Sequence, residues 1–82
     1  MKITIFSTRT CPYCKMLKSW LDNQKINYTN YNIDLNPIAA QSMINLSGQM
    51  GVPFTTIEYK DGSIEKILGF DRERFTRALA ED

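Results

Sequence analysis

The two cysteines of the chain lie three positions apart, in the run Cys11-Pro12-Tyr13-Cys14, shortly after an apolar stretch that ends at Phe6. This spacing after a β-prone segment is typical of reversible thiol–disulfide exchange, in which a thiolate attacks a disulfide sulfur. A disulfide between the two would close so small a loop that the chain-entropy model assigns it only about 2 kcal/mol. The leading hypothesis is therefore redox chemistry.

Two other uses of the cysteine pair stay open. Tetrahedral zinc normally takes four Cys or His ligands, and the sequence has no His and no third Cys, so a metal or cluster would need a second chain or an outside thiol. An inert bridge is the other use. On a helix, residues three apart have Cβ atoms about 5–6 Å apart, whereas a relaxed disulfide needs about 3.8 Å. Such a bridge would be strained and easily reduced.

Length and charge limit the remaining possibilities. A chain of 82 residues predicts one domain over residues 1–82. Its net charge of +1, from 10 basic and 9 acidic residues, gives no electrostatic reason to expect a nucleic acid or an anionic membrane as partner. The stretch from Met1 to Phe6 is too short and too polar for a signal-peptide core, and no apolar run is long enough to span a membrane. We therefore expect a cytoplasmic protein, in which a dithiol is mostly reduced.

The elements that must position the cysteines alternate between strand and helix. Ile3 to Phe6 form a β-prone run, followed by a polar connection in which Thr10 is the expected N-cap. Pro12 falls in the first turn of the helix, where proline is tolerated. The helix ends at Asp22 to Gln24. Helical spacing predicts a buried stripe, which consists of Met16, Leu17, Trp20 and Leu21.

The second half of the chain continues the alternation. A strand is expected over 28–33, and Asn36 with Pro37 predicts the start of a helix that runs to about Leu46 and ends at Gly48. Strands over 54–59 and 63–68 flank a hairpin turn at Asp61-Gly62. Asp71 then opens the last helix. The order β-α-β-α-β-β-α predicts an α/β protein with a mixed sheet and helical crossovers.

The expected helix gives the two cysteines different roles. Cys11 lies where the leading N–H groups are unpaired and the helix dipole favours negative charge, so its thiolate is stabilised and Cys11 is the expected nucleophile. Cys14, one turn deeper and less exposed, is expected to resolve the mixed disulfide. Arg9 either adds positive charge near the pair or is a solvated loop residue.

Gly51-Val52-Pro53-Phe54 is a second candidate constellation. A residue before proline is pushed to extended geometry, so the backbone of Val52 could pair with an extended substrate segment. From proline statistics alone the Val52–Pro53 bond would be trans, because only about 5–6% of such bonds are cis.

Three motifs in this order resemble the glutaredoxins of the thioredoxin fold: the Cys-Pro-Tyr-Cys run, Val52-Pro53 before the third strand, and Gly69-Phe70-Asp71 before the last helix. The dithiol, short prokaryotic glutaredoxin-like subgroup is the most similar. The resemblance implies a thioredoxin fold, in which a four-stranded mixed sheet is flanked by three helices, and a cis Val52–Pro53 bond facing the cysteines. It also implies a thiol–disulfide oxidoreductase in which Cys11 and Cys14 are catalytic and Pro12, as part of the motif, favours catalysis.

The resemblance further implies a glutathione groove. Tyr13 would lie beside the tripeptide, Val52 would pair with its cysteine backbone, and Asp71 would lie near its γ-glutamyl end. The substrate-binding set is Tyr13, Val52, Pro53, Gly69, Phe70 and Asp71. Asp71 is also an expected N-cap, and Tyr13 could instead be a surface aromatic that shields the disulfide.

Departures from the family pattern leave the electron donor open. Many glutaredoxins have a lysine where this chain has Thr8, and a Gly-Gly-X-Asp-Asp-like segment where this chain has Leu68-Gly69-Phe70-Asp71-Arg72. Glutathione is the expected co-substrate. In related short proteins thioredoxin reductase supplies the electrons and ribonucleotide reductase receives them. We expect a monomer that acts on disulfide-containing client proteins without a bound metal or prosthetic group. The alternative from another class is a glutathione-ligated iron–sulfur cluster scaffold.

Overall fold

The computed structural model describes residues 1–81, which form four strands and three helices in the predicted order. These elements are β1 (Lys2–Ser7), α1 (Pro12–Asn23), β2 (Thr29–Asn32), α2 (Pro37–Ser47), β3 (Phe54–Glu58), β4 (Ile64–Leu68) and α3 (Arg72–Leu79). The strands form one sheet in the order β2-β1-β3-β4. β1 and β2 are parallel, whereas β3 is antiparallel to both β1 and β4. The predicted mixed sheet is confirmed.

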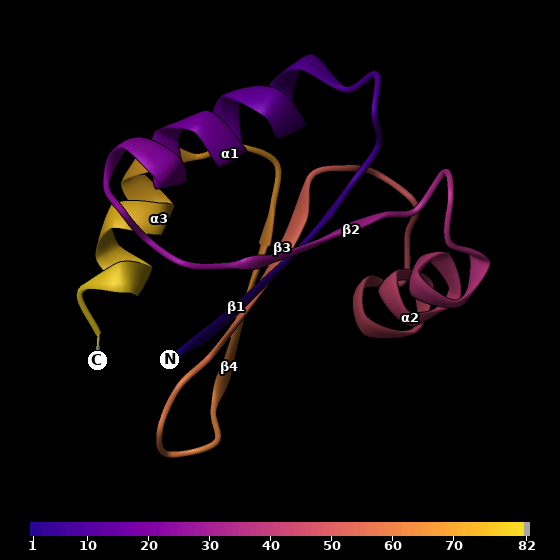
Figure 1. Cartoon of the computed structure of the whole chain (residues 1–82). Helices are drawn as coiled ribbons and strands as arrows, with labels where there is room; N and C mark the ends of the chain where they lie inside the picture. The colour runs from indigo at the N-terminus through magenta and orange to yellow at the C-terminus, as the bar shows by residue number, and fades with distance from the viewer. Residues whose placement is uncertain (82) are drawn as a thin grey trace.

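Helices cover both faces of this sheet. α1 and α3 lie on one side, and α2 lies on the other (Figure 1). Because successive side chains of a strand point to opposite faces, Ile5 belongs to the core cluster under α1 and α3, and Phe6 belongs to the cluster under α2. The first cluster contains Ile3, Ile5, Leu17, Leu21, Ile57, Ile67, Phe75 and Ala78. The second contains Phe6, Ala39, Met43 and Phe54.

The buried stripe of α1 is narrower than the sequence predicts. Leu17 and Leu21 are fully buried, but the prediction for Met16 was wrong, because its side chain is 52% exposed. Neighbouring residues of a helix differ by about 100° in direction, so Met16 points away from the face that carries Leu17. Trp20 lies at the margin of this face and packs against Phe75, with ring centroids 6.2 Å apart.

The helix starts differ from the sequence prediction at one position. The N-cap of α1 is Cys11 rather than Thr10. Pro12 occupies the first turn and forces the residue before it into extended geometry, which an N-cap requires. The caps of α2 and α3 are as predicted, since Asn36 accepts a hydrogen bond from Ala39 N at 3.0 Å and Asp71 caps α3.

The hairpin between β3 and β4 confirms the predicted turn at Asp61-Gly62. Tyr59 N donates to the Ser63 carbonyl at 2.9 Å, and Gly62 has a φ of 88°. β3 and β4 are each one residue shorter than expected, and β2 spans only Thr29–Asn32, because pairing with the neighbouring strands ends at these residues. Lys2 pairs with Glu58 and Phe6 with Phe54. The hairpin turn therefore lies at the end of the sheet opposite the loop that carries Cys11.

Candidate active site

Cys11 lies between the end of β1 and the first turn of α1. Its Sγ accepts a hydrogen bond from the backbone N–H of Cys14 at 3.2 Å and lies 3.9 Å from the carbonyl oxygen of Val52. The residue is partly exposed, so a second sulfur can reach it. The sulfur thus lies at the start of α1, with the backbone N–H of Cys14 directed at it. The nucleophilic role of Cys11 stays a prediction.

Cys14 has the opposite environment. It is fully buried, and both cysteines are free thiols in this structure. Burial, the hydrogen bond with Cys11 and the charge of Cys11 raise the pKa of Cys14 from 9.0 to about 11, against smaller lowering effects from the backbone of Thr8 and from Lys18. The two sulfurs of the motif therefore differ in access, and the environment of Cys14 favours its protonated thiol.

The second motif, Val52-Pro53, lies beside Cys11 of the first motif. The Val52–Pro53 peptide bond is cis, as the family resemblance implied and contrary to proline statistics. Val52 is partly exposed and Pro53 is fully buried. The carbonyl of Val52 faces Cys11, and the carbonyl of Pro53 accepts a hydrogen bond from Gly69 N at 2.8 Å. This bond joins the second motif to the third.

The third motif combines structural and exposed groups. The Asp71 carboxylate accepts a hydrogen bond from Arg74 N at 3.1 Å and caps α3, as expected. The Phe70 ring packs against the rings of Trp20 and Phe75, with centroids 5.9 Å and 6.4 Å away. What this segment offers a ligand is therefore mainly backbone, together with the exposed carboxylate of Asp71.

The supporting residues of the first motif occupy defined positions. Pro12 is the first residue of α1, and the Tyr13 side chain is 63% exposed. Arg9 is a solvated loop residue, which was one of its two expected roles, because its side chain is 62% exposed. Its Nε also lies 2.8 Å from Asp34 Oδ2 in the loop before α2. The Arg9 guanidinium lowers the pKa of Asp34. The positive charge of Arg9 is therefore paired, and the contact ties the cysteine loop to a distant segment.

Sequence reasoning missed two polar side chains near the motifs. Asp34 is the ion-pair partner of Arg9, and Gln49 binds the backbone of Gly51. Gln49 lies four residues before Pro53, in the segment between α2 and β3. A polar residue shortly before Pro53 was the available signal. No periodicity or spacing connects Arg9 with Asp34, so the sequence held no signal for that pair.

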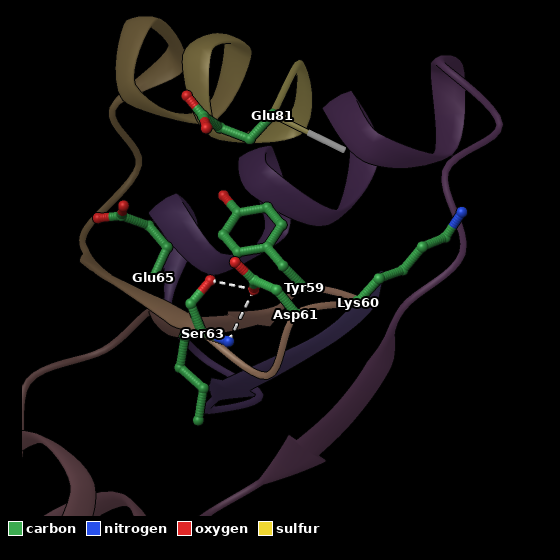
Figure 2. Close-up of a pocket in the computed structure, with 7 residues that line it drawn as sticks. Tyr59, Lys60, Asp61, Ser63, Glu65 and Glu81 are labelled. Carbon is green, nitrogen blue, oxygen red and sulfur yellow. Dashed lines mark hydrogen bonds between the residues drawn. The ribbon is translucent and has the colours of Figure 1, made fainter.

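A hollow of about 540 Å³ lies at the hairpin end of the sheet (Figure 2). Its acidic side chains include Asp61, whose carboxylate accepts hydrogen bonds from the N–H and the hydroxyl of Ser63 at 2.9 Å and 2.6 Å. These bonds lower the pKa of Asp61. Asp61 therefore stabilises the turn, at the end of the sheet remote from the cysteines.

Residues 1–81 contain neither a close group of metal-ligating side chains nor a helix that could span a membrane. Nowhere in this part of the chain do three or more Cys, His, Asp or Glu side chains gather closely enough to hold a metal ion. Within the same residues, every helix is too short or too polar to cross a membrane.

A mixed sheet with helices on both faces, a Cys-X-X-Cys pair at the first helix start and a cis-proline loop beside it define a thiol redox protein of the thioredoxin class. The glutaredoxin family model matches residues 3–60. The chain belongs to the glutaredoxin family.

Individual relatives give the same assignment. A glutaredoxin-like 8.6 kDa protein of the rubredoxin operon of Clostridium pasteurianum is 35% identical over 77 residues, which cover 94% of this chain and 96% of the relative. Glutaredoxin 3 of Escherichia coli is 33% identical over 51 residues, or 62% of this chain and 61% of the relative. The structure of the glutaredoxin-like NrdH-redoxin of Escherichia coli superposes with a TM-score of 0.76 at 25% identity, covering 94% of this chain and 93% of that one. The fold and the class of chemistry are those of glutaredoxin-like and NrdH-like redox proteins.

Proposed function

We propose that this chain is a dithiol oxidoreductase that reduces protein disulfides or glutathione mixed disulfides through a reversible Cys11–Cys14 disulfide. One observation carries the proposal: a partly exposed Cys11 sulfur accepts the N–H of a fully buried Cys14 at a helix start. This pairing of an accessible sulfur with a protected one is what a two-step exchange needs.

The first step forms a mixed disulfide. The Cys11 thiolate attacks one sulfur of the client disulfide, so a new S–S bond joins Cys11 to the client and the second client sulfur leaves as a thiolate. The N–H of Cys14 and the start of α1 stabilise the attacking charge. The client sulfur approaches beside the carbonyl of Val52, which lies 3.9 Å from Cys11 Sγ.

The second step closes the intramolecular disulfide. Cys14 loses its proton and attacks Cys11 Sγ, which releases the client with both of its sulfurs reduced. Two of the causes that raise the pKa of Cys14, the hydrogen bond and the charge of Cys11, disappear once the Cys11 sulfur is in a mixed disulfide. Formation of the first bond therefore lowers the pKa of Cys14 and promotes the second step.

The glutathione groove is a proposal built on the three joined motifs. The backbone of Val52 is partly exposed beside Cys11, and the bond from Gly69 N to the Pro53 carbonyl brings the start of α3 to the same place. Unpaired N–H groups at a helix start suit a carboxylate of the tripeptide. Tyr13 and Asp71, both exposed, are the side chains proposed to border it.

The alternative donor is thioredoxin reductase, as in a glutaredoxin-like donor to ribonucleotide reductase. Two departures from the glutaredoxin pattern support this donor over glutathione. Thr8 provides no positive charge for a glycyl carboxylate. At the start of α3, the Arg72 guanidinium lies over the Trp20 ring, 6.0 Å from its centroid. The similarity to the Escherichia coli NrdH-redoxin, described as glutaredoxin-like with a thioredoxin-like activity profile, also supports this donor.

An NADPH-coupled assay tests the function and separates the donors. Oxidised protein is supplied with glutathione and glutathione reductase in one arm and with thioredoxin reductase in the other, with Cys11→Ser as the control. Turnover in either arm that Cys11→Ser abolishes supports the oxidoreductase and identifies its donor. A chain that turns over in neither arm would refute it.

A further inference from the structure

We propose that Gln49 is a positioning residue that holds the Gly51–Val52 backbone in the conformation to which a substrate binds. This inference rests on the proposed function, because it concerns substrate pairing beside Cys11. It adds a side chain that is not one of the three motifs.

The Gln49 carboxamide binds both polar groups of the Gly51 backbone. Its Oε1 accepts a hydrogen bond from Gly51 N, and its Nε2 donates to the Gly51 carbonyl at 3.3 Å. One planar side chain thus fixes Gly51 from both sides of its Cα. Backbone held in this way loses the freedom that glycine otherwise has.

The same carboxamide is anchored to α2. Gln49 Nε2 donates to the Ser47 hydroxyl at 3.1 Å, and this hydroxyl donates to the Met43 carbonyl at 2.6 Å. Ser47 is the last residue of α2, and Met43 is fully buried in the core. The hydrogen bonds therefore run from the packed helix to the loop before Val52.

The lack of a side chain on Gly51 leaves room for the Gln49 carboxamide. A Cβ on Gly51 would lie 2.6 Å from Gln49 Oε1 and 3.6 Å from Leu68 Cδ1, so the carboxamide oxygen occupies the space that a side chain would need. The φ of Gly51 is not among the positive values of the chain. A side chain at position 51 would therefore have to displace the Gln49 carboxamide from this contact, although the backbone conformation alone would admit one.

The consequence falls on Val52. Pro53 is already held by Gly69 N at 2.8 Å, whereas the preceding side of the loop is held by Gln49. Without the carboxamide, Val52 would sample several conformations, and the apparent affinity for substrate would fall by the fraction that remains competent. The inference therefore predicts an effect on substrate binding, with Cys11 itself unchanged.

The test compares Gln49→Ala and Gln49→Glu with Gln41→Ala, a matched control whose glutamine lies on the exposed face of α2 and bonds to Asn45. The substrate is a peptide that carries a glutathione mixed disulfide, and the donor is the one that sustains turnover of the unaltered chain. Gln49→Ala is expected to raise KM about tenfold with kcat within about twofold, because about three modest hydrogen bonds are lost. Gln49→Glu keeps the acceptor for Gly51 N but loses both bonds that Nε2 donates. Its KM should therefore lie between that of the unaltered chain and that of Gln49→Ala.

Alkylation of Cys11 by iodoacetamide is the second readout. This small reagent does not pair with the Val52 backbone, so its rate should be unchanged in every variant. A Gln49→Ala variant with the KM of Gln41→Ala, or with alkylation slowed as much as turnover, would overturn the inference while the function stands. An unaltered chain that is inactive would reject the proposed function and this inference together.

Discussion

The backbone N–H of Gly69 donates a 2.8 Å hydrogen bond to the carbonyl of Pro53. This bond connects the start of α3 to the cis-proline loop, whose preceding carbonyl, that of Val52, faces Cys11. The second and third segments of the candidate site are therefore joined backbone to backbone, whereas the first segment contacts Val52 through the Cys11 side chain. Side-chain substitutions at their surface should change affinity more readily than they change the architecture.

Exchanging Gly69 tests this connection. Gly69 has a φ of 84° and Gly62 a φ of 88°, and a Cβ at either position would have no atom within 4 Å. Gly69→Ala and Gly62→Ala should both lower the free energy of unfolding by about 1 kcal/mol through backbone strain alone. Only Gly69→Ala should also slow turnover. Alanine keeps the N–H, but relief of the strain at this φ would move the N–H away from the Pro53 carbonyl, and only Gly69 bonds to Pro53. Urea titrations and the coupled assay measure the two effects, and equal turnover in both variants would contradict the role of this bond.

Replacing one cysteine at a time should separate the two steps. Cys14→Ser keeps the attacking sulfur but lacks the resolving one, so it should accumulate a covalent adduct with a disulfide client. Cys11→Ser should form none, because Cys14 is buried and its pKa is raised to about 11. Intact-mass spectrometry without reductant detects the adduct. Equal labelling of both variants would show that Cys14 is also accessible to clients.

Stability should fall at alkaline pH because of Cys14. Its pKa is raised from 9.0 to about 11 in the folded protein, chiefly by burial. In this range the unfolded chain has lost the Cys14 proton and the folded chain has kept it, so the free energy of unfolding decreases as the pH rises. Cys14→Ser should lack this part of the decrease, whereas Tyr28, with a pKa raised to about 12, contributes to both proteins. Urea midpoints for both proteins at about pH 8 and about pH 10.5 measure the difference; a difference independent of pH would be inconsistent with the buried thiol.

The ion pair of Arg9 predicts little influence on Cys11 reactivity. The Arg9 guanidinium is bound to Asp34 at 2.8 Å, so removing its charge with Arg9→Gln should leave the rate of iodoacetamide alkylation nearly unchanged. Asp34→Asn releases the guanidinium from its partner and should change the rate more than Arg9→Gln does. If Arg9→Gln slows alkylation several-fold instead, the guanidinium acts on the sulfur directly.

A visible spectrum addresses the cluster-scaffold alternative. Cys14 stands one turn from Cys11 and bonds to its sulfur, an arrangement suited to disulfide formation. Protein purified without oxygen should therefore show no absorbance at visible wavelengths, and added glutathione should not change this. Visible absorbance that Cys11→Ser removes would favour a cluster ligated by Cys11.

The sequence by itself determined which elements form, the caps of α2 and α3 and the position of the hairpin turn. Asn36 with Pro37, Gly48 and Asp61-Gly62 act through local backbone preferences, so their effects are readable without knowledge of distant residues. The order of strands and helices followed from these signals and from the periodicity of apolar residues. The family resemblance then supplied the cis Val52–Pro53 bond, which local preference opposed.

Only the tertiary structure decided how the motifs meet. Three contacts depend on side-chain directions and on which segments the sheet brings together. They are the hydrogen bond from Gly69 to Pro53, the ion pair of Arg9 with Asp34, and the hydrogen bonds between Gln49 and Gly51. Helical periodicity likewise could not show that Met16 falls just outside the covered face. The pKa of Cys14 belongs to the same group of properties, because its main cause is burial, and burial exists only once α1 has packed on the sheet.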